Sequence, residues 1–253
     1  MKAMILAAGL GTRLRPLTDD RPKALVEVAG HTLVEITLSR LRSLGIREVI
    51  VNVHHFADMV ADYLKKNDNF GMRIEISRED VLLDTGGGLK KAAWFFLENS
   101  GHAPGHEREP FLLHNVDAIS TIDLERMVQF HRERQALVTL AVQNRETSRY
   151  LLFDKQGQLC GRRAGPDQAS EMARPSRQAH ALAFSGIHVI SSRFLSMIVE
   201  EGVFSIIQTY LRLAGLGEKI LAFRADEYYW RDLGTPGNIA QAAKDVKEGK
   251  LQL

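Results

Sequence analysis

The sequence predicts an α/β protein with a mostly parallel mixed sheet and helices on both faces. Short apolar or β-branched runs, such as KAMILAA at 2–8 and REVIVNV at 47–53, have the length of buried strands. Segments with helical spacing of apolar residues separate them, for example 33–44, which stops at Gly45. Strands separated by helices of this length imply βαβ crossovers. In such sheets the ligand binds beyond the carboxyl ends of the strands.

The other elements follow in order along the chain. In the first half we expect helices at 57–66, 89–98 (opened by a glycine run) and 123–134, and strands at 72–77, 110–117 and 136–143. In the second half we expect a hairpin at 148–162 that turns at Gly157, strands at 181–191 and 219–225, and helices at 192–200, at 205–214 and after Pro236. Two stretches without periodicity, 99–109 and 162–180, are predicted to be loops. No repeat or linker divides the chain, so we expect one domain over residues 1–253.

Composition limits the function classes. The chain has 33 Lys and Arg against 31 Asp and Glu, a balance that excludes the sequence-independent phosphate affinity of a nucleic-acid binder. The single cysteine, Cys160, excludes an intramolecular disulfide and a multi-cysteine metal site. No run approaches the roughly 20 apolar residues of a membrane span, and the opening apolar run is too short for a signal peptide. We therefore expect a cytoplasmic protein with no membrane or nucleic-acid partner.

The loop after the first strand is the most informative segment, MILAAGLGTRLRPLTDDRPKAL at 4–25. It is no dinucleotide fingerprint, because Leu14 stands where a third glycine is needed, and no Walker A loop, because Gly-Thr-Arg replaces Gly-Lys-Ser/Thr. Gly9 and Gly11 allow close approach of the backbone to a ligand, and the basic residues Arg13, Arg15 and Lys23 follow. These residues alone leave two readings open, a triphosphate-binding loop and a solvated basic turn.

The segment LAAGLGTRLRPLTDDRPKAL resembles the signature loop of the sugar-1-phosphate nucleotidyltransferases, the nucleotide-sugar pyrophosphorylases. Four further segments match that family in its order: DTGGG at 84–88, HNVD at 114–117, FSGIHV at 184–189 and WRDLGTP at 230–236. The length is similar to that of the compact branch, which includes N-acetylmuramate-1-phosphate uridylyltransferases and small mannose-1-phosphate guanylyltransferases. The resemblance implies a Rossmann-like, GT-A-like fold with a nucleotide-binding half (about 1–145) and a sugar-phosphate-binding half (about 146–253).

The implied reaction joins a nucleoside triphosphate to a sugar 1-phosphate and releases pyrophosphate. The attacking phosphate is already anionic, so no protein nucleophile is needed, and the sequence offers no serine-hydrolase elbow or cysteine–histidine pattern. UTP with a hexose or N-acetylated sugar 1-phosphate is the leading substrate pair. GTP with mannose or heptose 1-phosphate and CTP with phosphocholine are alternatives. A non-catalytic regulator that binds nucleotide-sugars with the same fold is a further alternative, and whether the chain forms a homo-oligomer stays open.

The resemblance also assigns residues. Nucleotide binding would fall to Ala8, Gly9, Gly11, Thr12, Arg13, Lys23, Gly87, Gly88 and Asn115. Catalysis would rest on Arg13 at the leaving pyrophosphate, Lys23 at the α-phosphate and Asp117. Mg²⁺ would be held by Asp117 and Asp232, since this ion prefers one or two carboxylates beside phosphate oxygens. Gly186 would let the sugar approach the strand.

Several of these residues, and the neighbouring Asp84, could instead have a purely structural role. Asp117 can cap the end of a strand, Asp232 can stabilise a turn, Gly186 can serve a bulge, and Asp84 can cap the next helix. A zinc site from His54, His55 and His114 lacks the expected ligand spacing.

The chain departs from the family in two places. Val116 stands between Asn115 and Asp117, where the family commonly has a small residue. The Glu-Lys-Pro segment that binds the sugar phosphate in many relatives is replaced by EMARP at 171–175. We therefore expect Glu171 to bind sugar hydroxyls and Arg174 to replace the lysine charge.

Overall fold

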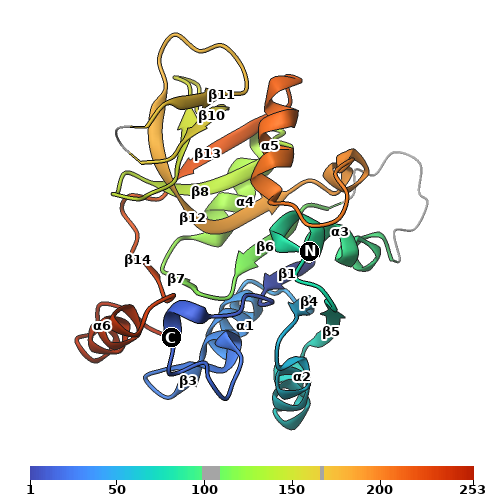
Figure 1. Cartoon of the computed structure of the whole chain (residues 1–253), viewed down its shortest axis with the longest axis vertical. Helices are drawn as coiled ribbons and strands as arrows, with labels where there is room; N and C mark the ends of the chain where they lie inside the picture. Colours follow the sequence, from blue (N-terminus) through green and yellow to red (C-terminus); the bar gives the residue numbers. More distant parts are fainter. Residues whose placement is uncertain (99–108, 166–167) are drawn as a thin grey trace.

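The computed structural model describes residues 1–98, 109–165 and 168–253. Its main feature is a ten-stranded sheet with the order β11-β10-β9-β12-β6-β1-β4-β5, in which β8 pairs with β12 and β13 pairs with β8 (Figure 1). The strands of this sheet are β1 (Ala3–Leu6), β4 (Glu48–Val53), β5 (Arg73–Arg78), β6 (Phe111–Asn115), β8 (Val138–Gln143), β9 (Tyr150–Phe153), β10 (Leu159–Arg163), β11 (Ser170–Met172), β12 (His180–Ile190) and β13 (Ile220–Arg224). Two short pairs stand apart from it, β2 (Glu27–Val28) with β3 (His31–Thr32) and β7 (Ala118–Ser120) with β14 (Trp230–Asp232).

The helices connect these strands. They are α1 (Leu33–Ser43), α2 (Ala57–Lys66), α3 (Asp84–Leu97), α4 (Leu124–Glu133), α5 (Ile206–Gly215) and α6 (Pro236–Lys247), with short 3₁₀ helices η1 (Thr12–Leu14), η2 (Lys23–Leu25), η3 (Asp68–Gly71) and η4 (Ser192–Met197). Side-chain caps begin several of them. The α1 helix starts with a capping box between Thr32 and Glu35, and Asp123, Ser205 and Thr235 cap α4, α5 and α6. Within the described ranges, no helix has the length and apolar character to cross a membrane.

The direction of the strands divides the sheet. Strands β5, β4, β1 and β6 run parallel, as do β8 and β13. Strand β12 runs antiparallel to β6, β8 and β9, and the β9–β10 hairpin and β11 extend the sheet from there. The predicted mixed α/β sheet is confirmed, with its parallel part in the first half of the chain.

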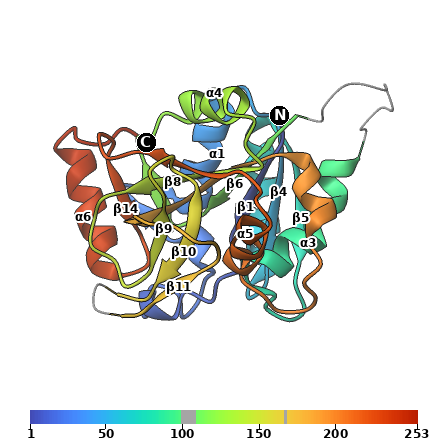
Figure 2. The same cartoon turned by 90° about the horizontal axis from the view of Figure 1, so that it is seen from above.

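Two hydrophobic clusters cover opposite faces of this sheet. Ala3 and Ile5 of β1 belong to one cluster, and Met4 between them belongs to the other, as the twofold alternation of a strand requires. The first cluster contains residues of α1, α2, α4 and α6, and the second contains residues of α3 and α5, which lie next to each other (Figure 2). The expectation of helices on both faces is therefore confirmed.

The structure corrects three local expectations. The segment 192–200 forms the 3₁₀ helix η4 rather than an α-helix. The glycine run does not precede a helix but lies inside the first turns of α3. The stretch 162–180 contains the end of β10 and the edge strand β11. The other predicted loop, 99–109, lies outside the described residues except for Glu109.

Candidate active site

A cavity of about 360 Å³ opens at the carboxyl ends of β1 and β6. This is the edge of a parallel sheet at which ligands bind in open α/β folds. The walls come from the glycine loop, from the ends of β4, β5 and β6, and from the start of α3. The lining residues are Leu6, Ala8, Gly9, Lys23, Asn52, Glu79, Leu82, Asp84, Thr85, Asn115, Val116, Asp117 and Val203.

The glycine loop presents its backbone at this cavity. Gly11 has φ +65°, and a Cβ at that position would lie 2.9 Å from Thr18 Cγ2. Thr18 Oγ1 in turn donates to the Gly11 carbonyl at 2.9 Å, which fixes the turn. A Cβ on Gly9 would meet no protein atom within 4 Å. The loop is therefore held rigidly at Gly11 and open at Gly9, so a ligand can approach the backbone there.

The Arg13 side chain extends from this loop to the turn at Gly234, which is distant in sequence. A Cβ on Gly234 would lie 2.7 Å from Arg13 Nη2 and 2.6 Å from Asp232 Oδ1, so a larger residue would displace one of these groups. The Gly234 amide donates to Asp232 Oδ1 at 2.7 Å. The structure therefore brings Arg13 beside the turn that carries Asp232.

Lys23 and Asp117 form an ion pair, and their side chains are only 12% and 18% exposed. The β14–β7 pairing places Asp232 opposite Ala118, the neighbour of Asp117, and the Leu233 amide donates to the Asp117 carbonyl at 2.8 Å. Residues opposite each other in antiparallel strands have Cα atoms about 5 Å apart. The structure thus places the strand that carries Asp232 beside the Lys23–Asp117 ion pair.

The two carboxylates fit a magnesium ion by their chemistry. Mg²⁺ is bound in proteins through one or two carboxylates together with phosphate oxygens and water. The partner of Asp117 in the structure is the Lys23 ammonium, so a positive group lies against this carboxylate. In the described part of the chain, no group of three or more His, Cys, Asp or Glu could hold a metal by itself.

The histidines of the zinc alternative lie in other environments. His114 is 1% exposed, and burial lowers its pKa to about 4. Its Nδ1 lies 2.8 Å from the Asn115 carbonyl, and His54 Nδ1 lies 2.7 Å from the Glu79 carbonyl.

Glu79 and Asn52 form a buried polar link that the sequence analysis missed. Asn52 Nδ2 donates to Glu79 Oε1 at 2.7 Å, and Asn52 Oδ1 accepts from the Ala7 amide at 2.7 Å. The other carboxylate oxygen, Glu79 Oε2, accepts from the Leu83 amide at 2.9 Å. The link therefore ties the start of the glycine loop to the segment before α3. The available signal was the position of both residues at the carboxyl ends of predicted strands.

The glycine run packs against protein rather than lining the cavity. A Cβ on Gly86 would lie 2.3 Å from the Phe204 ring, and one on Gly87 would lie 2.5 Å from the Gly202 carbonyl. A Cβ on Gly88 would lie 2.7 Å from Glu79 Oε1. Gly87 and Gly88 are buried, and the cavity wall is formed instead by Asp84 and Thr85. Asp84 has φ +59°, and its carboxylate accepts from the Thr85 amide at 2.6 Å instead of capping α3.

Asn115 and Gly186 lie against each other. Gly186 has φ +75° where the register of β12 against β8 shifts, and a Cβ there would lie 3.0 Å from Asn115 Nδ2. The glycine serves the bulge and at the same time makes room for the Asn115 side chain, which lines the cavity.

Glu171 and Arg174 are not brought to this site. Glu171 lies on the edge strand β11 and pairs with Arg162, 2.6 Å from its Nε. Arg174 pairs with Asp154 at the β9–β10 turn and donates from Nε to the Leu159 carbonyl at 3.0 Å. Three strands, β10, β9 and β12, separate β11 from β6, which is a distance of about 19 Å at the usual strand spacing.

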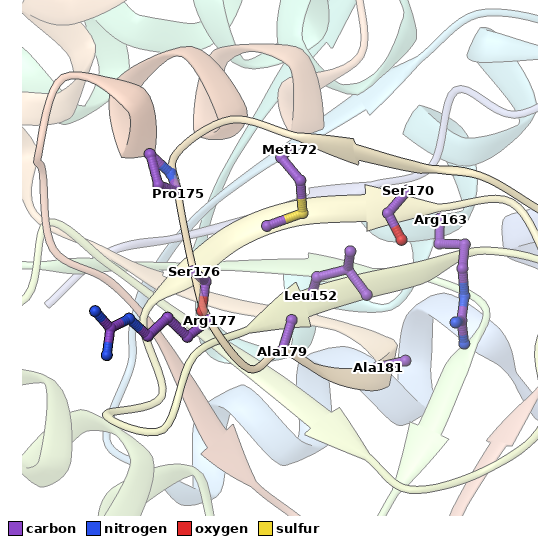
Figure 3. A pocket seen from close by; sticks show the side chains of 9 residues that line it. All are labelled: Leu152, Arg163, Ser170, Met172, Pro175, Ser176, Arg177, Ala179 and Ala181. Atoms are coloured by element: carbon purple, nitrogen blue, oxygen red, sulfur yellow. The ribbon is translucent and has the colours of Figure 1, made fainter.

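The segment around these residues forms a separate cavity of about 470 Å³ on the outer strands (Figure 3). Leu152, Met172, Ala179 and Ala181 supply its apolar wall, and Arg163 and Arg177 point outward at its two ends. Glu171 and Arg174 therefore lie on the outer strands and do not line the cavity at the carboxyl ends of β1 and β6.

The α/β fold thus has a cavity at the carboxyl edge of its parallel strands, lined by the glycine loop and by the Lys23–Asp117 ion pair. A model of the nucleotidyl transferase family matches residues 2–249, and the chain belongs to that family. It is 34% identical over 246 residues to the N-acetylmuramate alpha-1-phosphate uridylyltransferase of Caulobacter vibrioides, a match that covers 92% of each chain.

Other relatives match in part. The chain is 34% identical over 151 residues to a UTP–glucose-1-phosphate uridylyltransferase of Synechocystis, which covers 55% of this chain and 36% of that one. It is also 34% identical over 143 residues to a probable mannose-1-phosphate guanylyltransferase of Oryza sativa, which covers 56% and 38%.

Solved structures share the fold. HddC from Yersinia pseudotuberculosis, complexed with GMP-PN, superposes with a TM-score of 0.73 at 20% identity over 97% of this chain and 99% of that one. A putative glucose-1-phosphate thymidylyltransferase from Bacillus anthracis superposes with a TM-score of 0.77 at 17% identity over 100% and 97%.

Proposed function

We propose that this nucleotidyltransferase transfers the nucleotidyl group of a nucleoside triphosphate to a sugar 1-phosphate. The observation that carries this proposal is the convergence of Lys23, Asp117 and Asp232 at the edge of the sheet, beside the glycine loop. The names of the relatives, all of them sugar-1-phosphate nucleotidyltransferases, support the acceptor class.

In this reaction an oxygen of the acceptor phosphate attacks the α-phosphorus. A new P–O bond forms, the bond from the α-phosphorus to the bridging oxygen breaks, and pyrophosphate leaves with that electron pair. Because the nucleophile is anionic, the protein's task is to position two anions and to stabilise the charge that develops. No general base is required.

The side chains divide this task. The backbone at Ala8, Gly9, Gly11 and Thr12 cradles the triphosphate, and the Arg13 guanidinium stabilises the leaving pyrophosphate. Lys23, oriented by Asp117, contacts the α-phosphate. Asn115 faces the ribose or the sugar. Gly87 and Gly88 contribute to nucleotide binding indirectly. They allow α3 to pack closely against its neighbours, which positions Asp84 and Thr85 at the cavity.

Asp117 and Asp232 are the residues that would hold Mg²⁺. When bound, the ion would neutralise phosphate charge and orient the phosphate oxygens.

UTP with an N-acetylated or simple hexose 1-phosphate is the proposed substrate pair. The match to the Caulobacter uridylyltransferase over 92% of both chains supports it. GTP with mannose or heptose 1-phosphate is the second candidate, and the partial match to the Oryza guanylyltransferase supports it. We assign residues of about 1–145 to nucleotide binding and about 146–253 to the acceptor, and we place the reaction in the cytoplasm.

The test is pyrophosphate release with Mg²⁺, for UTP, GTP, CTP, ATP and dTTP crossed with glucose, N-acetylglucosamine, N-acetylmuramate and mannose 1-phosphates. Release with one pair is expected, and it names both substrates. Binding of nucleotide without release for any pair, by protein shown to be folded, would favour the non-catalytic regulator. The Asp117→Asn variant controls for a contaminating activity.

A further inference from the structure

Arg145 follows β8 and is fixed by two other strands. Its guanidinium carbon lies 3.7 Å from the centroid of the Trp230 ring, and its Nη2 donates to the Phe184 carbonyl at 2.7 Å. Trp230 is itself fixed, because its Nε1 donates to the Ser185 carbonyl at 2.7 Å. Stacking and hydrogen bonding together hold this guanidinium in one place.

That place is near the Asp232 carboxylate. Trp230 and Asp232 are two residues apart on β14, so their side chains leave the same face of the strand. Strand β12 extends past the end of β6, since Ile187 already pairs with His114. Phe184 and Ser185 therefore lie beyond the carboxyl end of β6, at the edge where Asp117 lies.

The charge of Arg145 is only partly compensated. Burial lowers its pKa, while the nearby Asp232 and Tyr150 act in the opposite direction. Within the described ranges of the chain, the buried Nε atom of Arg145 has no hydrogen-bond partner. A buried N–H donor without an acceptor costs free energy, and an anion bound at this partly buried guanidinium would remove that cost.

Two guanidiniums thus flank Asp232. Arg13 lies against Gly234, two residues after Asp232, and Arg145 covers Trp230, two residues before it. An enzyme that joins two phosphate anions needs a cation for each of them. Arg13 comes from the glycine loop, so it belongs with the nucleotide, which leaves Arg145 for the second anion.

We propose that Arg145 binds the phosphate of the sugar 1-phosphate acceptor and that Trp230 orients it for this contact. The assignment rests on the proposed function. It gives the acceptor phosphate the cation that Arg174 does not supply, since Arg174 is paired with Asp154 at the other end of the hairpin.

The kinetic test compares Arg145→Ala and Arg145→Lys with Arg149→Ala, an exposed arginine of the same loop. Arg145→Ala is expected to raise the KM for the acceptor about ten- to hundredfold while the KM for the nucleotide stays within about twofold. Arg145→Lys should restore part of the loss, and Arg149→Ala should match the wild type. An unchanged acceptor KM, or equal increases for both substrates with a lowered Tm, would overturn the proposal in favour of a structural role.

A binding test separates this inference from the activity itself. The chain has two tryptophans, and Trp94 lies on the exposed side of α3, so Trp94→Phe leaves Trp230 as the single reporter. Titration of this variant with glucose 1-phosphate, N-acetylmuramate 1-phosphate or inorganic phosphate is expected to change Trp230 fluorescence, and Arg145→Ala in the same background should abolish the change. A saturable signal without pyrophosphate release would keep this inference and reject the proposed reaction. Pyrophosphate release without an Arg145-dependent fluorescence signal would support the proposed reaction and reject the role of Arg145.

Discussion

Lys23 and Asp117 form an ion pair across the carboxyl edge of the sheet, in a largely buried position. The lysine is carried by the 3₁₀ helix η2 after Pro22, and the aspartate by the turn between β6 and β7. Neither element can move without breaking the pair, so the ammonium is oriented before any substrate binds.

Lys23→Ala should therefore lower kcat by about two to three orders of magnitude, with a smaller effect on the KM for the nucleotide. The reason is that the ammonium acts most strongly on the charge that develops at the α-phosphate. Steady-state kinetics measure both constants, and Arg15→Ala in the same loop is the control, because Arg15 is exposed. Equal losses in nucleotide binding and in kcat/KM would make Lys23 an anchor for the ground state.

Asp117→Asn should abolish turnover while nucleotide affinity stays within about threefold of the wild type. The amide keeps the shape of the side chain but removes the charge that a metal ion needs. Calorimetric titration with UTP and GTP gives the affinity, and pyrophosphate release gives the rate. Turnover near the wild-type level would remove Asp117 from the catalytic residues.

Gly186→Ala should lower the free energy of unfolding by more than Gly217→Ala does. Both glycines have positive φ, +75° and +88°, so both variants carry backbone strain of about 1 kcal/mol. Only at Gly186 does the new Cβ meet Asn115, whereas the space at Gly217 is empty. Urea unfolding of both variants measures the difference, and equal losses would show that β12 moves to accept the methyl group.

Stability should fall as the pH falls below about 6.5, because three buried histidines are neutral in the folded chain. Burial lowers the pKa of His114 and His131 to about 4 and that of His188 to about 3. The unfolded chain binds protons at these sites near pH 6.5, so protonation favours unfolding between pH 6.5 and about 4 and adds no further penalty below the folded pKa values.

At pH 5 the free energy of unfolding should be lower than at pH 7 by roughly 1–2 kcal/mol per histidine. Urea unfolding at several pH values measures this loss. A flat profile between pH 7 and 5 would mean that these histidines keep access to water.

The sequence predicted the parallel strands and most helices, because periodicity is a local signal, and the long glycine-loop motif indicated the family. The pairing of β14 with β7, which brings Asp232 to Asp117, depends on three-residue strands that have no periodicity to detect. Asn52 and Glu79 were missed for a related reason. A single polar residue at a strand end can be assigned a role only when its hydrogen-bond partner is known, and here the partner lies on another strand.

Two other expectations depended on contacts that the sequence does not contain. Glu171 and Arg174 were assigned from their correspondence to a family segment, whereas their distance from the cavity depends on the strand order. Gly87 and Gly88 were assigned to nucleotide binding, whereas the glycine run packs against protein, with the ring of Phe204 filling the space at Gly86. Neither fact can be derived from residues near the motif.

Strand β12 has a consequence for any attempt to separate the molecule into its two halves. It hydrogen-bonds β6 of the first half and β9 of the second, and it is also a neighbour of β8. A fragment ending near residue 145 would leave β6 as an unpaired edge strand. It would also lack β12 and β13, which are the two strands that pair with β8. Unpaired edges of this kind lead to aggregation. Residues 1–145 and 146–253 therefore share one sheet, and neither part is expected to be obtained as a stable fragment.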